Sequence, residues 1–266
     1  MSYDLPAKSP KIIAVANQKG GVGKTTTTIN LGTAMAAVKK RVLVIDMDPQ
    51  GNASTGLGVE RAQRQRNAYA ILTEDLPLAE VVCRTSVPGL SIIPSGVDLA
   101  GAELELVDMT EREFRLKKAL SSAVQDYDYV LIDCPPALGL LTLNALVAAH
   151  EVLVPLQCEF FALEGISHLM KTIDRVKRTL NPHLGIQGIV LTMFDKRNNL
   201  SGMVESDVRG YFGDKVFNTV IPRNVRVSEA PSHGKPVLLY DLRSSGAQAY
   251  VHLAGEVFKR EREMAI

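Results

Sequence analysis

The sequence predicts an α/β protein with a doubly wound, mostly parallel sheet flanked by helices. Three observations support this prediction. Short apolar, β-branched runs recur along the chain, several of them are apolar at consecutive positions, and segments long enough for crossover helices separate them. Strands and helices that alternate in this way form doubly wound sheets, whose ligands bind at the carboxyl ends of the strands.

The expected elements follow in chain order. Strands are predicted at residues 12–16, 42–46, 90–94, 129–133, 152–156, 189–193 and 220–222. The clearest helices are predicted at 25–40, 114–125 and 163–180, the last followed by the stop signal Asn181-Pro182. Residues 60–67, which include three arginines, are expected to form an exposed loop or the start of a helix. Because no repeat or linker interrupts the pattern, residues 11–266 are expected to form a single domain after a flexible lead at 1–10.

Composition narrows the class of protein. The chain has 266 residues, 46% of them hydrophobic, and a formal net charge of +1, which suits one large domain with a buried core. No apolar run approaches the ~20 residues of a membrane-spanning helix, and the first ten residues lack the apolar segment of a secretory signal. A cytoplasmic protein is therefore expected. The near-neutral net charge does not exclude nucleic-acid binding, because a local basic face can exist on a protein whose net charge is near zero.

The cysteines and two neighbouring phenylalanines are assigned no chemistry. Cys83, Cys134 and Cys158 are odd in number and form no CxxC pair, so a disulfide framework or structural zinc site is not expected. Cys134 is interpreted as a small packed residue. Phe160 and Phe161 are expected to pack in the core.

A glycine-rich turn lies between the first expected strand and the helix after it. Residues 17–26 read NQKGGVGKTT; the glycines let backbone N–H groups point inward, and the new helix adds its positive end. Lys24 is placed to reach the β- and γ-phosphates, and the Thr25 hydroxyl to bind magnesium. The strict P-loop pattern has glycine where this chain has Gln18, and the extra Lys19 has no role in it. The turn predicts an ATP–magnesium site formed by Lys19, Gly20, Gly21, Val22, Gly23, Lys24, Thr25 and Thr26.

Three aspartates stand at the ends of expected strands. Asp46 and Asp48 end the second run and, two residues apart on a strand, point the same way. Asp133 ends the fourth run. Single aspartates at such places are usually turn or cap residues. Three of them on the P-loop side are better explained by magnesium-bound waters and an attacking water, since phosphoryl transfer needs mainly positioned charge and a positioned nucleophile.

These motifs resemble those of the ParA/Soj chromosome- and plasmid-partitioning ATPases, which have a deviant P-loop. The likeness extends over nearly the whole chain. Its blocks are 19–26, 46–55 (DMDPQGNAST), 133–136 (DCPP), 155–165 (PLQCEFFALEG), 191–195 (LTMFD) and 221–236 (IPRNVRVSEAPSHGKP). The last two blocks are much more specific than a P-loop alone.

The resemblance implies roles for particular residues. Lys19 matches the signature lysine that reaches the partner's nucleotide in an ATP-sandwich dimer, and Asp48 the residue that orients the hydrolytic water. Asp46 and Asp133, in addition to Thr25, match residues that hold magnesium in the family. Pro222 and Asn224 match residues beside the adenine. Arg197 and Arg226 match residues that contact DNA non-specifically, although Arg226 could simply pair with Glu229 on the surface.

The resemblance also implies partners. Members of the family cycle between an ATP-bound homodimer on the nucleoid and an ADP-bound or apo monomer. They bind double-stranded DNA non-specifically, and a ParB-type centromere-binding protein stimulates slow ATP hydrolysis. No membrane partner is expected.

Three other functions share this fold. A MinD-like membrane-positioning ATPase needs a C-terminal helix with a bulky apolar face and basic flanks, whereas residues 256–266 have few bulky apolar side chains and several glutamates. A cluster carrier of the nitrogenase iron-protein type needs two cysteine ligands per chain, and only Cys134 is near the site. A small-molecule ligase or kinase needs a substrate pocket for which the sequence shows no motif.

Overall fold

The computed structural model describes residues 9–121, 124–160 and 162–264. Within these ranges the strands form one eight-stranded sheet with the order β3-β4-β2-β5-β1-β6-β7-β8. All neighbouring strands are parallel except β3, which pairs antiparallel with β4 at one edge. The strands are β1 Lys11–Val15, β2 Val42–Asp46, β3 Cys83–Arg84, β4 Leu90–Ile93, β5 Tyr129–Asp133, β6 Glu151–Gln157, β7 Gly185–Phe194 and β8 Val216–Pro222.

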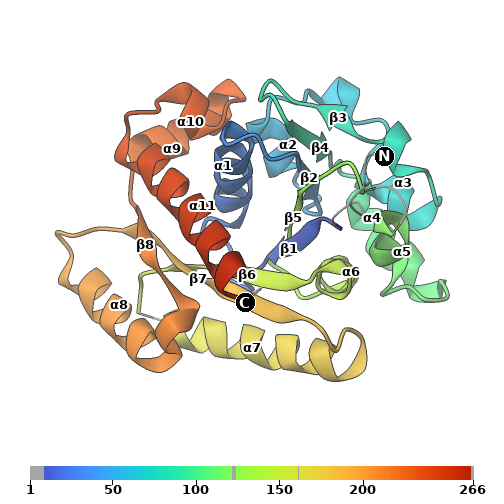
Figure 1. Ribbon diagram of the computed structural model, residues 1–266. Coiled ribbons are helices and arrows are strands. Elements are labelled where there is room, and N and C mark those ends of the chain that lie inside the picture. The colour runs from blue at the N-terminus through green and yellow to red at the C-terminus, as the bar shows by residue number, and fades with distance from the viewer. Residues whose placement is uncertain (1–8, 122–123, 161, 265–266) are drawn as a thin grey trace, which may run out of the picture.

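Helices cover both faces of the sheet, so the predicted doubly wound fold is confirmed (Figure 1). The helices are α1 Lys24–Ala37, α2 Asn52–Gly56, α3 Ala68–Thr73, α4 Leu99–Glu105, α5 Arg115–Leu120, α6 Leu140–Ala148, α7 Ala162–Thr179, α8 Asn199–Phe212, α9 Val225–Glu229, α10 Val237–Tyr240 and α11 Ser245–Met264. One buried cluster joins α1 and α11 to the sheet through residues such as Met35 and Tyr250. The other joins α6 and α7 to the opposite face through residues such as Leu146 and Leu169.

The seven predicted strands all exist, and the structure adds β3. β3 was missed because it has two residues, neither fully buried, at the edge of the sheet. The last three strands extend beyond their predicted ranges because their ends carry polar residues such as Glu151 and Asn218, which break the apolar pattern. Helices α1 and α7 match the predictions 25–40 and 163–180 closely.

Three expectations need comment. Helix α5 spans only part of the predicted 114–125, of which residues 122–123 lie outside the described ranges. Most of the predicted lead at 1–10 also lies outside them, as does Phe161. Phe160 is 76% exposed, so its expected place in the core is wrong. It lies in the connection between β6, which ends at Gln157, and α7.

The C-terminal helix α11 packs its apolar side inward. Tyr250, Leu253 and Val257 are fully buried in the cluster against α1 and the sheet. Among the described helices, none is both long and apolar enough to cross a bilayer. The apolar residues of α11 therefore stabilise the domain core.

Candidate functional site

The glycine-rich turn joins β1 to α1 at the carboxyl edge of the sheet (Figure 1). Two of its glycines have positive φ: Gly21 at 75° and Gly23 at 91°. Gly23 is the N-cap of α1 and provides no side-chain cap. The first backbone N–H groups of α1 consequently lack a side-chain acceptor, which leaves the positive end of the helix available to an anion.

Contacts with distant strands hold this turn in place. The Asn17 side chain donates to the backbone oxygen of Pro155 at 2.7 Å and accepts from the backbone N–H of Lys19 at 3.0 Å. The Thr192 hydroxyl donates to the backbone oxygen of Val22 at 2.8 Å. Sequence reasoning gave Asn17 and Thr192 no role, because the contacts that fix the turn, to Pro155 and to Val22, join residues more than a hundred positions apart.

The two lysines of the turn point to different surroundings. Lys24 is 7% exposed, and its Nζ donates to the backbone oxygen of Lys19 at 3.0 Å. Burial lowers the pKa of Lys24, while the charge of Asp133 opposes the shift. The Lys19 side chain is 41% exposed and forms an ion pair with Glu159. Lys24 thus serves the interior of the turn, and Lys19 lies at the protein surface.

Two of the predicted aspartates are buried neighbours. Asp46 on β2 and Asp133 on β5 are paired in register and have no exposed surface. Asp46 accepts hydrogen bonds from the N–H and the hydroxyl of Ser54, at 2.8 and 2.7 Å. Burial raises the pKa of Asp46 to about 6, because the hydrogen bonds from Ser54 only partly offset it. The pKa of Asp133 is raised well above its usual value by burial and then by the charge of Asp46.

The third aspartate is held by its backbone. Asp48 is 8% exposed, and its carboxylate accepts from the backbone N–H of Gln50 at 3.0 Å. The Ser95 hydroxyl donates to the backbone oxygen of Asp48 at 2.7 Å, and the N–H of Ser95 donates to the Ser54 hydroxyl at 3.0 Å. Ser54 and Ser95 therefore connect Asp46 to Asp48. Neither serine was identified from the sequence, which offers no signal beyond small polar residues after strands.

The acidic end of the site suits a cation that is held mainly through water and phosphate. Within the described ranges, no three His, Cys, Asp or Glu side chains are placed to hold a metal directly. However, Asp133 Oδ2 is buried and accepts no hydrogen bond from the described chain. The Thr25 hydroxyl and the charge of Lys24 lie close enough to lower the pKa of Asp133. An orphaned buried carboxylate oxygen beside a hydroxyl fits a hydrated magnesium ion.

Cys134 follows Asp133 and is 1% exposed. Burial raises the pKa of its thiol, and the charge of Asp133 raises it further. A buried thiol that stays protonated is a poor nucleophile and a poor metal ligand. These features agree with its interpretation as a packed residue.

A second candidate region lies farther along the carboxyl edge, on β7 and β8 at the end of the sheet. Pro222 and Arg197 line a groove of about 640 Å³ there, with Lys196 and Arg223, which the sequence reasoning did not select. Arg197 makes two hydrogen bonds to the Asp195 carboxylate, at 3.0 and 2.9 Å, although its side chain is 88% exposed. One predicted adenine residue, Pro222, and one predicted DNA residue, Arg197, therefore line the same groove.

The other two predicted residues of this region have local partners. The Asn224 side chain caps α9 by accepting from the N–H of Arg226 at 2.9 Å, and it donates to the Ser245 hydroxyl at 2.9 Å. The Arg226 guanidinium pairs with Glu229 at 3.0 Å and with Asp241 at 3.5 Å. Asn224 is thus a helix cap in this structure, and Arg226 forms the surface pair that the sequence suggested.

The chain is similar in sequence to proteins of known family. A family model described as an AAA domain matches residues 10–186. The chain is 59% identical over 261 residues to the chromosome partitioning protein ParA of Caulobacter vibrioides, covering 97% of this chain and 98% of that one. It is 56% identical over 247 residues to the sporulation initiation inhibitor protein Soj of Bacillus subtilis, covering 93% and 98%.

Solved structures give the same fold. The chain matches cobyrinic acid a,c-diamide synthase from Mycobacterium smegmatis, solved with a bound ATP analog and magnesium, with a TM-score of 0.84. The two are 38% identical, and the match covers 95% of this chain and 96% of that one. The identity to the partitioning proteins is higher and extends over nearly all of both chains. With its glycine-rich turn, its buried Lys24 and its strand-end aspartates, the chain belongs to the ParA/Soj family of P-loop ATPases.

Proposed function

We propose that the chain is an ATP-driven DNA-partitioning switch. In this proposal it binds ATP and magnesium at the P-loop, dimerises around the nucleotide, binds duplex DNA non-specifically and hydrolyses ATP slowly. A ParB-type protein stimulates the hydrolysis. The main supporting observation is that Lys19 lies at the surface of the turn while Lys24 alone serves its interior. A second lysine at the tip of a P-loop has a use if a partner's nucleotide comes to it.

Each residue of the site has a role in the reaction. The α1 N-terminus and Lys24 bind the phosphates, and the Lys24 ammonium leaves the backbone oxygen of Lys19 to do so. Magnesium, held by Thr25 and by waters on Asp46 and Asp133, would neutralise charge on the phosphate oxygens. Asp48 orients the attacking water, and its fixed backbone keeps the carboxylate aimed at the site.

The dimer surface is expected at the tip of the turn. A side chain added at Gly20 would meet no atom within 4 Å in this structure. Gly20 and Gly21 are exposed, and the exposed Phe160 follows Glu159, the ion-pair partner of Lys19. A second copy facing this surface would cover Phe160, and Lys19 would then lie near the nucleotide bound to that second copy.

The DNA-binding face is expected on the β7–β8 rim. Arg197 and Arg226 are exposed, and Lys196 and Arg223 add two positive charges to the groove beside them. Dimerisation doubles the number of phosphates that such a face can neutralise, so ATP would strengthen DNA binding. Affinity should fall steeply with salt and should not depend on DNA sequence.

The test is gel filtration and duplex-DNA binding measured side by side with ATP, with ADP and without nucleotide. We expect a dimer and DNA binding with ATP only. Arg197→Glu and Arg226→Glu should each weaken DNA binding severely without affecting ATP binding or dimerisation. The matched control is Arg175→Glu, an exposed site on α7 away from this rim. Equal DNA affinity with ATP and ADP would refute the switch.

Dimerisation has its own test. Gly20→Val should fold and bind ATP normally, since the added side chain meets open space, but it should remain monomeric in ATP by light scattering. Lys19→Ala should also impair the dimer. Dimers of normal stability in both variants would contradict the sandwich arrangement.

Two alternatives share the ATP site. A MinD-like membrane-positioning ATPase would be supported if the protein sedimented with liposomes in ATP, but the apolar side of α11 is buried against α1. A ligase acting on a small molecule is suggested by the name of the synthase structure, at 38% identity. The partitioning role agrees with the more similar relatives, at 59% and 56%.

A further inference from the structure

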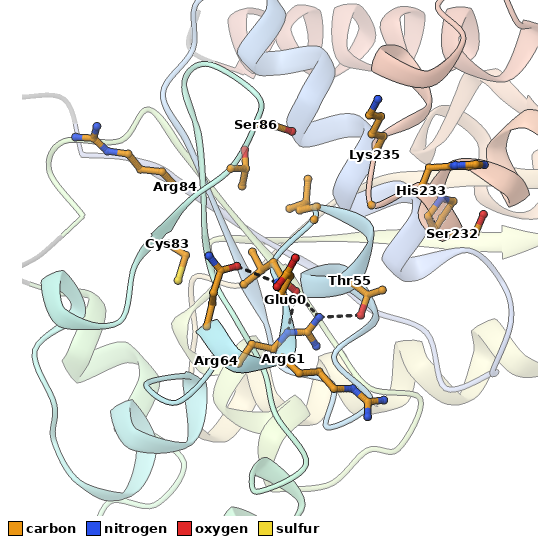
Figure 2. Close-up of a pocket in the computed structure, with 17 residues that line it drawn as sticks. Thr55, Glu60, Arg61, Arg64, Cys83, Arg84, Ser86, Ser232, His233 and Lys235 are labelled. Carbon is orange, nitrogen blue, oxygen red and sulfur yellow. Dashed lines mark hydrogen bonds between the residues drawn. The ribbon is translucent and has the colours of Figure 1, made fainter.

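A second large groove lies at the β3 end of the sheet, away from the glycine-rich turn. It has a volume of about 920 Å³ and runs between the segment after α2, strand β3 and the turn at 231–235 (Figure 2). No residue of the glycine-rich turn lines it. We call it the basic groove; its charged lining residues are Glu60, Arg61, Arg64, Arg84 and Lys235, with His233 beside them.

The charge of the basic groove is unbalanced. It is lined by three arginines and one lysine but only one carboxylate, that of Glu60, whereas the whole chain has a net charge of +1. In the described part of the chain, none of these four cations forms an ion pair. Arg66, which follows two residues after Arg64 but lies outside the groove, pairs with Glu80 at 2.7 Å.

Arg64 is the fixed part of the groove. Its guanidinium donates to the backbone oxygen of Gly51 at 3.1 Å, to that of Val59 at 2.6 Å and to the Thr55 hydroxyl at 2.9 Å. These acceptors carry no net charge, so they hold the guanidinium without neutralising it. Figure 2 shows Arg64 near the centre, beside Glu60 and Thr55, with Arg61, Arg84 and Lys235 on different sides of it. A fixed guanidinium with other exposed cations on several sides of it can attract an anion into the groove.

Two serine hydroxyls also line the groove. The Ser86 side chain makes no hydrogen bond within the described chain, whereas the Ser232 hydroxyl donates to the backbone oxygen of Glu229 at 2.6 Å. The walls come close together at Gly58 and Gly234, because a Cβ at Gly58 would lie 2.9 Å from the backbone oxygen of Gly234. The groove is therefore narrow at this point and offers four positive charges and the Ser86 hydroxyl against a single carboxylate.

We propose that the basic groove binds the phosphate group of a small phosphorylated molecule, such as a nucleotide or a sugar phosphate. Phosphate oxygens supply the negative charge that the groove lacks, and guanidinium groups match them with paired hydrogen bonds. The volume is in the range of small-molecule sites. A concave groove walled by β3 and the 231–235 turn suits a compact ligand better than a rigid duplex. It also lies at the sheet edge opposite β8, where DNA binding is proposed.

Occupancy of the groove has a direct route to the ATPase site. Arg64 binds the backbone oxygen of Gly51, which lies in the turn that follows Asp48. Thr55, the other anchor of Arg64, lies on α2 beside Ser54, which binds Asp46. A ligand that moves the Arg64 guanidinium would alter the support of the segment that carries Asp48.

The test uses the full chain saturated with ADP, so that the P-loop is filled, and inorganic pyrophosphate as the probe in isothermal titration calorimetry. We expect one binding site per chain under these conditions. Arg61→Ala and Lys235→Ala should each weaken pyrophosphate about tenfold, because each removes a charge-assisted contact. Arg66→Ala is the matched control and should bind pyrophosphate like the wild type. All three side chains are exposed, so the fold should be retained.

In the titrations beside ADP, three results would overturn the proposal. They are no pyrophosphate binding, equal weakening in Arg66→Ala, and displacement of pyrophosphate by a short duplex at equal phosphate concentration, which would assign the groove to nucleic acid. The P-loop variant Lys24→Ala separates the two sites: it should lose ADP and ATP but keep pyrophosphate in the groove. A loss of pyrophosphate in Lys24→Ala would place the probe in the P-loop and also overturn the proposal.

Discussion

Two regions of the sheet's carboxyl edge, one at the central strands and one at β7 and β8, handle charge in opposite ways. At the glycine-rich turn, Asp46, Asp133 and Lys24 are buried, and their pKa values shift because water is absent. At the β7–β8 rim, Arg197 and Arg226 remain in water, and nearby carboxylates already neutralise them. In the proposed function, the first region is assembled in advance for a small ligand that enters it. The second would exchange its own ion pairs for contacts with DNA.

This difference predicts how substitutions behave. In the buried region, removal of one charge leaves a neighbouring buried charge without its partner. This costs free energy because burial keeps solvent from compensating. On the rim, solvent and salt compensate for most changes, and each exposed pair contributes little. Changes at the turn should therefore be large and specific to nucleotide, whereas changes at the rim should be smaller and dependent on salt.

The largest expected effect is the loss of ATP affinity in Lys24→Ala. The buried ammonium is the cation of the cradle, so its removal should weaken ATP by at least about a hundredfold. A fluorescent ATP analogue measures this directly. Lys177→Ala, an exposed lysine on α7, is the control and should bind normally. Wild-type affinity in Lys24→Ala would mean that the phosphates lie elsewhere.

Asp48→Ala should separate binding from hydrolysis. Its carboxylate accepts only from the backbone N–H of Gln50 in the described chain, so removal leaves the cradle intact while the attacking water loses its guide. Turnover should fall by about a hundredfold or more, in the range of positioned acid–base groups, with ATP binding retained. Phosphate release and ATP binding are measured on the same sample. Unchanged phosphate release would remove Asp48 from the mechanism.

The buried carboxylates should make the nucleotide-free protein sensitive to pH. Because the folded pKa of Asp46 is raised to about 6, the fold favours the protonated form, and this contribution is lost as pH rises through about 6. Asp46→Asn removes the titrating charge, so between pH 5 and pH 8 its free energy of unfolding should fall by about 1–3 kcal/mol less than that of the wild type, at ~1.4 kcal/mol per pKa unit. The difference in free energy of unfolding between variant and wild type should therefore change with pH. Urea unfolding of both proteins without nucleotide, at pH 5 and at pH 8, provides the measurement. A difference in free energy of unfolding that does not change with pH would contradict this account.

The smallest effect is expected on the rim, and it has the opposite sign. Asp195→Asn keeps an oxygen that can accept from the backbone N–H of Arg197, but it removes the ion pair with the Arg197 guanidinium. DNA affinity with ATP should therefore rise about two- to fivefold. The increase should vanish as salt approaches a few tenths molar, roughly where phosphate contacts are screened. Fluorescence anisotropy on a labelled duplex across a salt series measures both. If DNA affinity fell instead, Asp195 would have to position Arg197 for DNA.

Part of the candidate site could be predicted because its residues lie at the ends of strands that the local sequence pattern identifies. The turn at 17–26 follows a strand, and Asp46 and Asp133 end strands, so a parallel sheet brings them to one edge. The same reasoning could not find Ser54 and Ser95, which matter only because α2 and β4 fold back together. Phe160 was misplaced for a related reason: an aromatic residue after a strand is often buried, but here the chain turns outward.

The sequence alone determined the fold class, seven of the strands and the position of the glycine-rich turn, because these depend on local patterns of apolar residues and glycines. Only the tertiary structure decided which charges are partnered. Arg64 and Arg66 are two residues apart in one polar stretch, yet one is fixed by neutral oxygens in a groove and the other pairs with Glu80. Lys19 and Lys24 differ in the same way. Whether a charge is free depends on which distant segments pack beside it, and no local pattern encodes that information.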